Sequence, residues 1–180
     1  MSLLSYNELL SLVESGVIDA PIENINSSSI DLTLDRFVMY ELDGDRDVVD
    51  LASKQNIAMS QFDLDIDDMV LFPGDFILAS SAEVFNLPNN ISAEYKLKSS
   101  MARNGLEHLN AGWCDAGWNG SKLTLELKNM TQNHRLCLTK GMKIGQVVFF
   151  RHEPVPEDKS YAARGQYNNQ TSVTASKGIR

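Results

Sequence analysis

The chain has 180 residues, 43% of them hydrophobic and 22% charged, which is enough for one domain with a buried core. Its net charge of -8 argues against DNA, RNA or an anionic membrane surface as a partner, because such partners require a basic surface. The 2 cysteines are too few for a disulfide framework, and no signal-peptide pattern or membrane-spanning run is visible, so we expect a cytoplasmic protein.

A short helix is expected near the start of the chain, over residues 5–16. Ser5 and Glu8 have the spacing of a capping box, and apolar residues at 9, 10, 12 and 13 supply one hydrophobic side. Gly16 then provides a C-terminal stop.

Most of the remaining chain has the pattern of short β-strands. Apolar and polar residues alternate over 30–34 and 123–127, and the other strand-like segments are 37–42, 69–72, 76–79 and 147–150. Such a series, with turns like Pro73-Gly74-Asp75, predicts a compact barrel or sandwich.

Two segments lack this pattern. Residues 43–68 are acidic and weakly patterned, and we expect them to form a solvated loop outside the barrel. Residues 154–180 contain few apolar side chains, so they cannot form a core of their own. They are expected to be a tail that is either mobile or folded over the rest of the protein.

Residues 98–105 could bind an anion. Serines at the start of a helix leave backbone N–H groups free, and Arg103, one turn later, would add a fork-shaped donor for phosphate. The alternative is an ordinary helix cap beside a surface arginine.

Residues 110–120 place Asp115 between two glycines and near two tryptophans. Glycine lets the backbone approach a ligand closely, and Asp115 could bind a sugar hydroxyl or orient a water molecule. A tight turn with aromatic neighbours would explain the same residues without a ligand.

Glu126 lies on the strand face opposite Leu123, Leu125 and Leu127. If that face lines a pocket, burial would raise the pKa of Glu126 and allow it to shuttle protons. If it faces water, Glu126 is an ordinary surface residue.

Zinc-dependent chemistry is not expected. Base deaminases that use zinc need clustered histidine and cysteine ligands, and none of these residues has ligand spacing here: His108, His134, His152, Cys114 and Cys137. A Walker phosphate loop and a G-x-S-x-G elbow are also absent from the sequence. Any hydrolysis would therefore use a carboxylate and a positioned water molecule.

Six segments, taken in order, resemble those of dCTP deaminases, which are relatives of the trimeric dUTPases. The segments are Ile25–Leu32, Lys98–Arg103, Ala111–Trp118, Leu123–Leu127, Gly141–Gln146 and Tyr167–Gln170. Each motif is weak alone, but six in the family's order are a specific signal.

The resemblance implies a mainly β fold, a distorted dUTPase-like β-barrel with a short N-terminal helix and a few small helices. Residues 1–153 would form the barrel and residues 154–180 a lid over the active site. The assembly would be a homotrimer with active sites between subunits, binding neither nucleic acid nor membranes.

The implied reaction is deamination of dCTP to dUTP and ammonia by a glutamate-activated water without zinc. Mg²⁺ would bind through the triphosphate, and dTTP would be a feedback inhibitor. The implied catalytic residues are Glu126, Ser99 and Arg103. The implied nucleotide-binding residues are Lys98, Ser100, Ala111, Asp115, Trp118, Gln146, Tyr161, Tyr167 and Gln170.

Several positions depart from the family pattern. Ala116 replaces a usual proline, and Gln166 stands where a phosphate-binding lysine is common. The interval from Trp118 to Glu126 is one residue longer than usual, which predicts a bulge near Ser121.

The main prediction has two alternatives. Residues 111–115 resemble a stretch shared by dUTPases and by bifunctional enzymes, so the protein could be a bifunctional dCTP deaminase-dUTPase that gives dUMP and pyrophosphate, or a dUTPase alone. A regulatory binding module is the non-enzyme alternative, but it would be expected to lose Glu126 or Asp115, and both are present.

Overall fold

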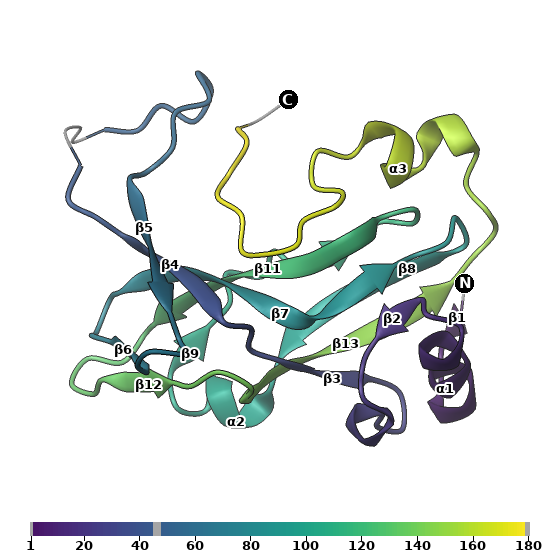
Figure 1. The fold of residues 1–180 in the computed structure, drawn as a ribbon, viewed down its shortest axis with the longest axis horizontal. Helices are drawn as coiled ribbons and strands as arrows, with labels where there is room; N and C mark the ends of the chain where they lie inside the picture. The colour runs from purple at the N-terminus through teal and green to yellow at the C-terminus, as the bar shows by residue number, and fades with distance from the viewer. Residues whose placement is uncertain (1, 45–47, 179–180) are drawn as a thin grey trace.

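The computed structural model describes residues 2–44 and 48–178, and its strands form three antiparallel sheets (Figure 1). The first sheet has five strands: β1 (Ser2–Leu3), β13 (Lys143–Arg151), β8 (Ile91–Leu97), β10 (Trp113–Cys114) and β3 (Ile30–Thr33), the last paired with β13. The second has six: β5 (Met59–Asp63), β4 (Phe37–Glu41), β7 (Phe76–Asn86), β11 (Asn119–Asn129), β9 (Leu106–Glu107) and β2 (Ile18–Asp19), the last paired with β7. The third pairs β12 (Leu136–Leu138) with β6 (Met69–Leu71).

The helices are short. They are α1 (Tyr6–Glu14), α2 (Ser99–Ala102) and α3 (Tyr161–Arg164), with two 3-10 helices at Ile22–Asn24 and Glu157–Lys159. None of the helices in the described ranges is both long and apolar enough to span a bilayer.

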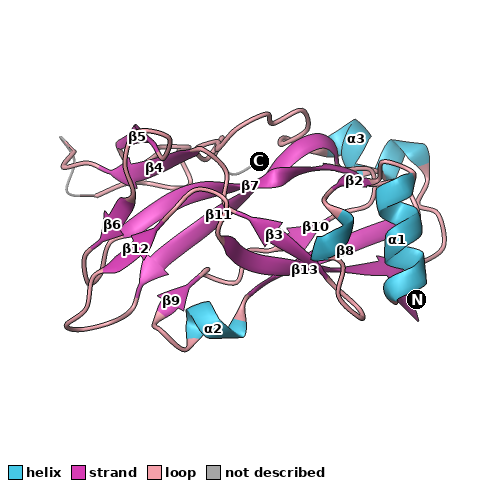
Figure 2. Cartoon of the chain, turned by 60° about the horizontal axis from the view of Figure 1, so that its bottom comes forward, coloured by secondary structure: helices cyan, strands magenta, loops and turns pink. Residues whose placement is uncertain are grey.

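The predicted mainly β fold is confirmed (Figure 2). Between the described strands, hydrogen bonds link each sheet internally but do not join the sheets into a closed ring, so the barrel is open. The sheets meet through side chains, and the largest fully buried ones include Phe85 on β7, Tyr95 on β8 and Phe149 on β13.

An aromatic cluster connects the two large sheets to the segment after β10. The ring centroids of Phe85 and Phe149 are 6.4 Å apart, and those of Phe85 and Trp118 are 5.2 Å apart. Aromatic pairs at these separations pack favourably, so the core fixes the position of Trp118.

The expected N-terminal helix is confirmed, with α1 lying within residues 5–16. The backbone N–H of Ser5 donates to Glu8 at 3.2 Å, which is one half of the predicted capping box. Gly16 follows the helix with φ +74°, a conformation that suits glycine at a helix end.

The expected bulge near Ser121 is also confirmed. The pairing of β11 with β7 changes register between Asn119 and Ser121 and again between Lys122 and Thr124. Gly120 adopts φ +62°, as the inserted residue of a bulge often does.

The expectation of a loop over residues 43–68 was wrong for its later part. Residues 59–63 form β5, which pairs with β4 from Phe37↔Asp63 to Glu41↔Met59. We call residues 37–44 and 48–63 the arm (upper left of Figure 1). The strand was missed because its polar residues obscure the apolar alternation.

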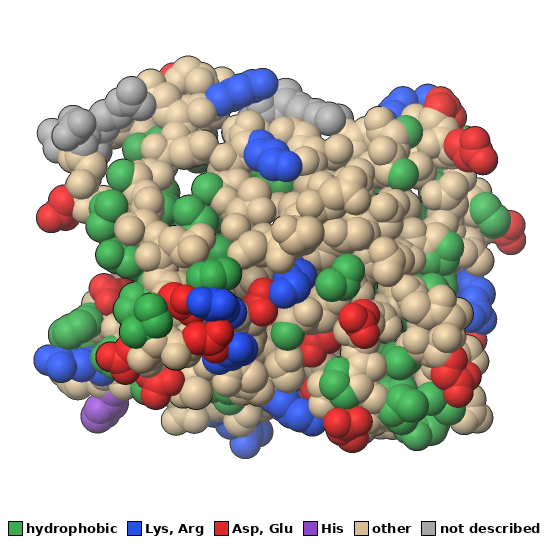
Figure 3. All heavy atoms as spheres, in the orientation of Figure 1, with side chains coloured by type: hydrophobic (Ala, Val, Ile, Leu, Met, Phe, Trp, Pro, Cys, Tyr) green, Lys and Arg blue, Asp and Glu red, His purple; other side chains and the backbone are tan. Residues whose placement is uncertain are grey.

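Ion pairs hold the base of the arm. Arg36 contacts Asp63 at 2.5 Å and Asp65 at 3.1 Å, and Lys140 contacts Asp65 at 2.6 Å. The hydrogen bond from Arg36 lowers the pKa of Asp63 to about 2. Figure 3 shows a mixed group of acidic and basic side chains in the lower half of this face.

Gly145 on β13 lets the strand lie directly against the Tyr95 ring. A Cβ atom added to Gly145 would be 2.0 Å from Cε2 of Tyr95, whose side chain is fully buried. We therefore expect Gly145→Ala to lower the free energy of unfolding by about 1–3 kcal/mol through overpacking, measured by urea denaturation.

The Tyr95→Phe variant serves as a control for this substitution. It removes only the hydroxyl, which has no hydrogen-bond partner among residues 2–44 and 48–178, so little stability should be lost. If Gly145→Ala is as stable as the wild-type protein, the contact with the Tyr95 ring does not constrain this strand.

Candidate active site

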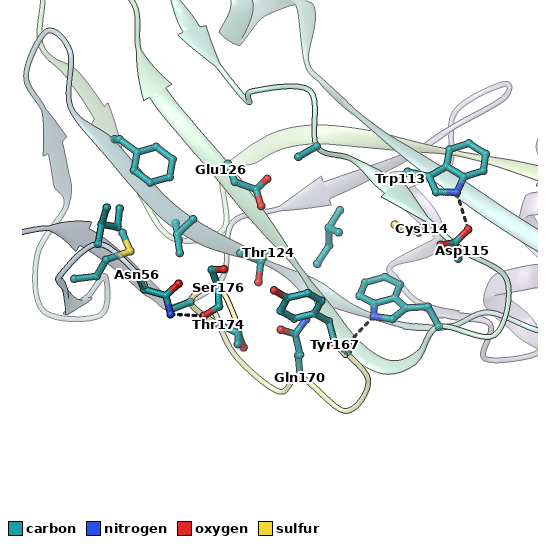
Figure 4. A pocket seen from close by; sticks show the side chains of 18 of the residues that line it. Asn56, Trp113, Cys114, Asp115, Thr124, Glu126, Tyr167, Gln170, Thr174 and Ser176 are labelled. Atoms are coloured by element: carbon teal, nitrogen blue, oxygen red, sulfur yellow. Dashed lines mark hydrogen bonds between the residues drawn. The ribbon is translucent and has the colours of Figure 1, made fainter. Parts of the chain in front are cut away.

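A cavity of about 490 Å³ lies between the arm, β7, β11, residues 111–118 and the C-terminal tail (Figure 4). Figure 3 shows hydrophobic side chains around the hollow between the arm and the tail. The cavity is lined by Leu51, Asn56, Ile57, Met59, Phe76, Leu78, Ala111, Trp113, Cys114, Asp115, Trp118, Leu123, Thr124, Glu126, Tyr161, Tyr167, Gln170, Thr174, Ala175 and Ser176.

β11 forms the floor of this cavity. Leu125 and Leu127 are buried in the core, while Thr124 and Glu126 alternate with them and face the cavity. Burial raises the pKa of the Glu126 carboxyl group above its usual value. The structure thus places Glu126 in a pocket rather than on a solvated face, which is the condition for a proton shuttle.

Residues 111–118 form one wall and hold a second carboxylate. The indole N–H of Trp113 donates to Oδ1 of Asp115 at 2.9 Å. Gly112 brings this segment against β8, since its carbonyl accepts from the Tyr95 N–H at 2.8 Å. A Cβ atom on Gly112 would be only 2.8 Å from Cβ of Tyr95, so glycine is required for this close approach.

The tail is folded over the cavity, which was one of the two expected arrangements. The indole N–H of Trp118 donates to the carbonyl of Tyr167 at 2.7 Å. The Lys122 N–H donates to the carbonyl of Gln170 at 2.8 Å, and the Gln170 N–H donates to Oγ of Ser121 at 3.1 Å. These bonds attach the tail to the edge of the β11 bulge.

The tail also contacts the arm. Nδ2 of Asn56 donates to the carbonyl of Ser176 at 2.8 Å, and both residues line the cavity (Figure 4). The roof of the cavity is therefore built from two segments that are 120 residues apart in the sequence.

The cavity brings together 7 of the 12 residues that the sequence proposed. These are Ala111, Asp115, Trp118, Glu126, Tyr161, Tyr167 and Gln170. Sequence reasoning missed the arm residues because that segment was expected to be solvated. It also missed Thr124, although the alternation around Glu126 puts both side chains on one strand face.

The other proposed residues lie away from this cavity: Lys98, Ser99, Ser100, Arg103 and Gln146. Ser99, Ser100 and Arg103 are exposed on or beside α2, which Figure 1 places opposite the tail. Lys98 instead pairs with the buried Asp31 at 2.6 Å.

Gln146 belongs to the same neighbourhood as Asp31. Its Oε1 atom accepts from Oγ of Ser29 at 3.4 Å, and the strand register places Gln146 opposite Asp31. The single chain therefore divides the proposed residues between two regions.

The cavity contains two acidic side chains, and no Lys or Arg lines it among the described residues. Within the same described ranges, no three His, Cys, Asp or Glu side chains lie close enough to bind a metal ion. Cys114 and Cys137 are both unpaired, and burial raises the pKa of the Cys114 thiol, which keeps it protonated.

The open β fold is shared with a solved protein. The structure titled 2'-deoxycytidine 5'-triphosphate deaminase from Agrobacterium tumefaciens aligns with a TM-score of 0.63 and 21% identity. The alignment covers 82% of this chain and 47% of that one, so this chain spans about half of the solved chain.

The sequence comparisons identify the family. A family model described as dCTP deaminase-like matches residues 3–152, and the chain belongs to this family. A relative from Methanosphaerula palustris named "dCTP deaminase, dUMP-forming" is 37% identical over 155 residues, covering 85% of this chain and 81% of its own. A relative with the same name from Hydrogenobaculum is 35% identical over 179 residues, covering 97% and 95%.

The raised pKa of Glu126 predicts how stability depends on pH. Between the ordinary and the raised pKa, the folded protein binds more protons than the unfolded chain, so stability falls as pH rises through this interval. Glu126→Gln removes the buried charge, and we expect a higher Tm than the wild-type protein at neutral pH.

The difference in Tm between the two proteins should shrink as pH falls below the ordinary glutamate pKa, where Glu126 is neutral in both states. Thermal denaturation across a pH series measures it. A variant less stable than the wild type at neutral pH would show that Glu126 makes a stabilising contact instead.

Proposed function

We propose that this protein is a bifunctional dCTP deaminase that converts dCTP to dUMP, pyrophosphate and ammonia. The observation that carries the proposal is the presence of two carboxylates, Glu126 and Asp115, in one cavity. The main prediction from the sequence had dUTP as the final product, and the alternative was a bifunctional enzyme that gives dUMP. The relatives are named "dUMP-forming", which supports the alternative.

Glu126 is proposed to act in the deamination step. Its ionised carboxylate takes a proton from water, and the resulting hydroxide forms a bond to C4 of cytosine. Glu126 passes that proton to N3, then takes the proton of the new C4 hydroxyl and passes it to the amino group, so that the C–N bond breaks, ammonia leaves and the C4 carbonyl of uracil forms. A raised pKa suits both roles, because the group must accept and return a proton near neutral pH.

Asp115 is proposed to act in the hydrolysis step. Its carboxylate is fixed by the Trp113 indole N–H, which leaves oxygen lone pairs free to bind the 3′-hydroxyl or to orient water. Attack of that water on the α-phosphorus breaks the bond to the β-phosphate, releasing pyrophosphate and dUMP.

The charge of a triphosphate must be offset, since acidic residues line the cavity without a described Lys or Arg. Mg²⁺ fits this requirement because it is usually held by substrate phosphates and water, without a full set of protein ligands. When bound to the triphosphate, it would neutralise charge on the phosphate oxygens.

The division of the proposed residues into two regions supports a homotrimer. If α2 of one subunit contacts the cavity of its neighbour, Ser99, Ser100 and Arg103 would join Glu126 at a shared site. Exposed side chains on α2 are consistent with this arrangement. Inhibition by dTTP and a cytoplasmic location remain predictions.

We also propose that residues 154–178 act as the lid of the 1–153 domain. The tail lines the cavity through Tyr161, Tyr167 and Gln170, and hydrogen bonds attach it to Trp118 and Lys122. A lid of this kind excludes water from the reacting centre and opens for exchange.

The central experiment is product analysis with dCTP and Mg²⁺, followed by the same assay with dUTP supplied directly. We expect dUMP and pyrophosphate from both, and ammonia from dCTP only. Glu126→Gln should reduce deamination by at least about 10²-fold. Asp115→Asn should suppress pyrophosphate release from dUTP. Stable accumulation of dUTP would show that the protein is a deaminase only.

The shared site predicts complementation between two inactive variants. Glu126→Gln and Arg103→Ala chains, unfolded together and reassembled in equal amounts, should recover up to about a quarter of wild-type activity, the random fraction of intact sites. Each variant reassembled alone is the control. Activity no greater than the sum of the two controls would contradict a site built from two subunits.

A further inference from the structure

The hydroxyl group of Thr124 has no partner in the structure although it is buried. Its Oγ1 atom lies out of contact with solvent, and no hydrogen-bond partner occurs among residues 2–44 and 48–178. Thr124 lines the cavity, so rotation of its side chain about χ1 would bring the unpaired hydroxyl to a molecule bound there. Buried polar groups are nearly always paired in folded proteins, and a molecule bound in the cavity would supply the missing partner here.

The position of this hydroxyl is defined by the strand that carries it. Thr124 and Glu126 are two residues apart on one face of β11, which separates them by about 7 Å. On the other side, Gln170 is held by the Lys122 N–H at 2.8 Å, and its Oε1 atom also lacks a described partner. Thr124 thus lies between Glu126 and Gln170 along the cavity (Figure 4).

The proposed function sets a requirement that this hydroxyl can meet. The cavity must hold cytosine in the first reaction and uracil in the second. These bases differ at C4, which carries an amino group that donates hydrogen bonds in cytosine and a carbonyl group that accepts them in uracil. A hydroxyl group can both accept and donate, and it changes role by rotating its hydrogen.

We propose that the Thr124 hydroxyl binds the C4 substituent of both bases, and that it allows one cavity to serve both reactions. It accepts from the amino group of dCTP and donates to the carbonyl oxygen of dUTP. The backbone need not move between the two states, since Thr124 is paired with Ser80 of β7. Thr124 is therefore a specificity-determining residue, and this inference rests on the proposed function.

Two substitutions test the role of the hydroxyl. Thr124→Val keeps the branched shape without the oxygen, and Thr124→Ser keeps the oxygen. We expect Thr124→Val to lower kcat/KM about tenfold or more for both dCTP and dUTP, as expected when a hydrogen bond to substrate is lost. Thr124→Ser should keep most of the wild-type kcat/KM for both nucleotides.

The Tm of the Thr124→Val variant, measured without nucleotide, distinguishes a binding role of the hydroxyl group from a structural role. Removing an unpaired buried hydroxyl should leave the Tm of Thr124→Val equal to or above the wild-type value, whereas a structural hydroxyl would lower it. Thr174→Val is the matched control. Thr174 lines the same cavity, but its hydroxyl already donates to the carbonyl of Ser172 at 3.1 Å. The kcat/KM of the Thr174→Val variant should fall much less than that of the Thr124→Val variant.

The outcomes distinguish this inference from the proposed function. If the wild-type protein releases no pyrophosphate from dUTP, the proposed second reaction fails, and with it the dual role of the hydroxyl. If the wild type carries out both reactions and Thr124→Val keeps its kcat/KM for both nucleotides, only the inference is overturned. A Thr124→Val defect that Thr124→Ser does not relieve would also overturn it.

Discussion

One face of β11 packs into the apolar core and the other presents polar side chains to the cavity. The rest of the site depends on this division. Leu125 and Leu127 fill the core, while Thr124 and Glu126 face the cavity on the same strand. Pairing with β7 fixes the backbone of β11, so the strand cannot turn the side chains of Thr124 and Glu126 into the core. The burial that raises the Glu126 pKa follows from packing the arm and the tail over this polar face.

The bulge in β11 connects this floor to the tail. Beside the bulge, the Lys122 N–H donates to the Gln170 carbonyl, and the Gln170 N–H donates to Oγ of Ser121. The segment that covers the cavity therefore docks at the bulge. The aromatic contact between Phe85 and Trp118 supports the same region from the core side.

Patterns within short stretches of the sequence predicted those helices and strands that depend on interactions between neighbouring residues. The capping box located α1 and alternation located β11, while comparison with the family pattern, which is one residue shorter before Glu126, located the bulge. The pairing of β5 with β4 is a contact between segments, and a polar composition concealed it. Seven of the residues named from the family's motifs line one cavity, but no sequence pattern could show that α2 lies on a different side of the same chain.

The roof of the cavity has a mechanical consequence. A described hydrogen bond joins its two halves, from Nδ2 of Asn56 to the carbonyl of Ser176, while the floor belongs to a sheet held by many backbone bonds. Local openings cost least where such bonds are few. For the proposed nucleotide, exchange would then proceed by separating the roof while the β11 floor stays rigid, and surface substitutions in the roof would tune residence time independently of chemistry.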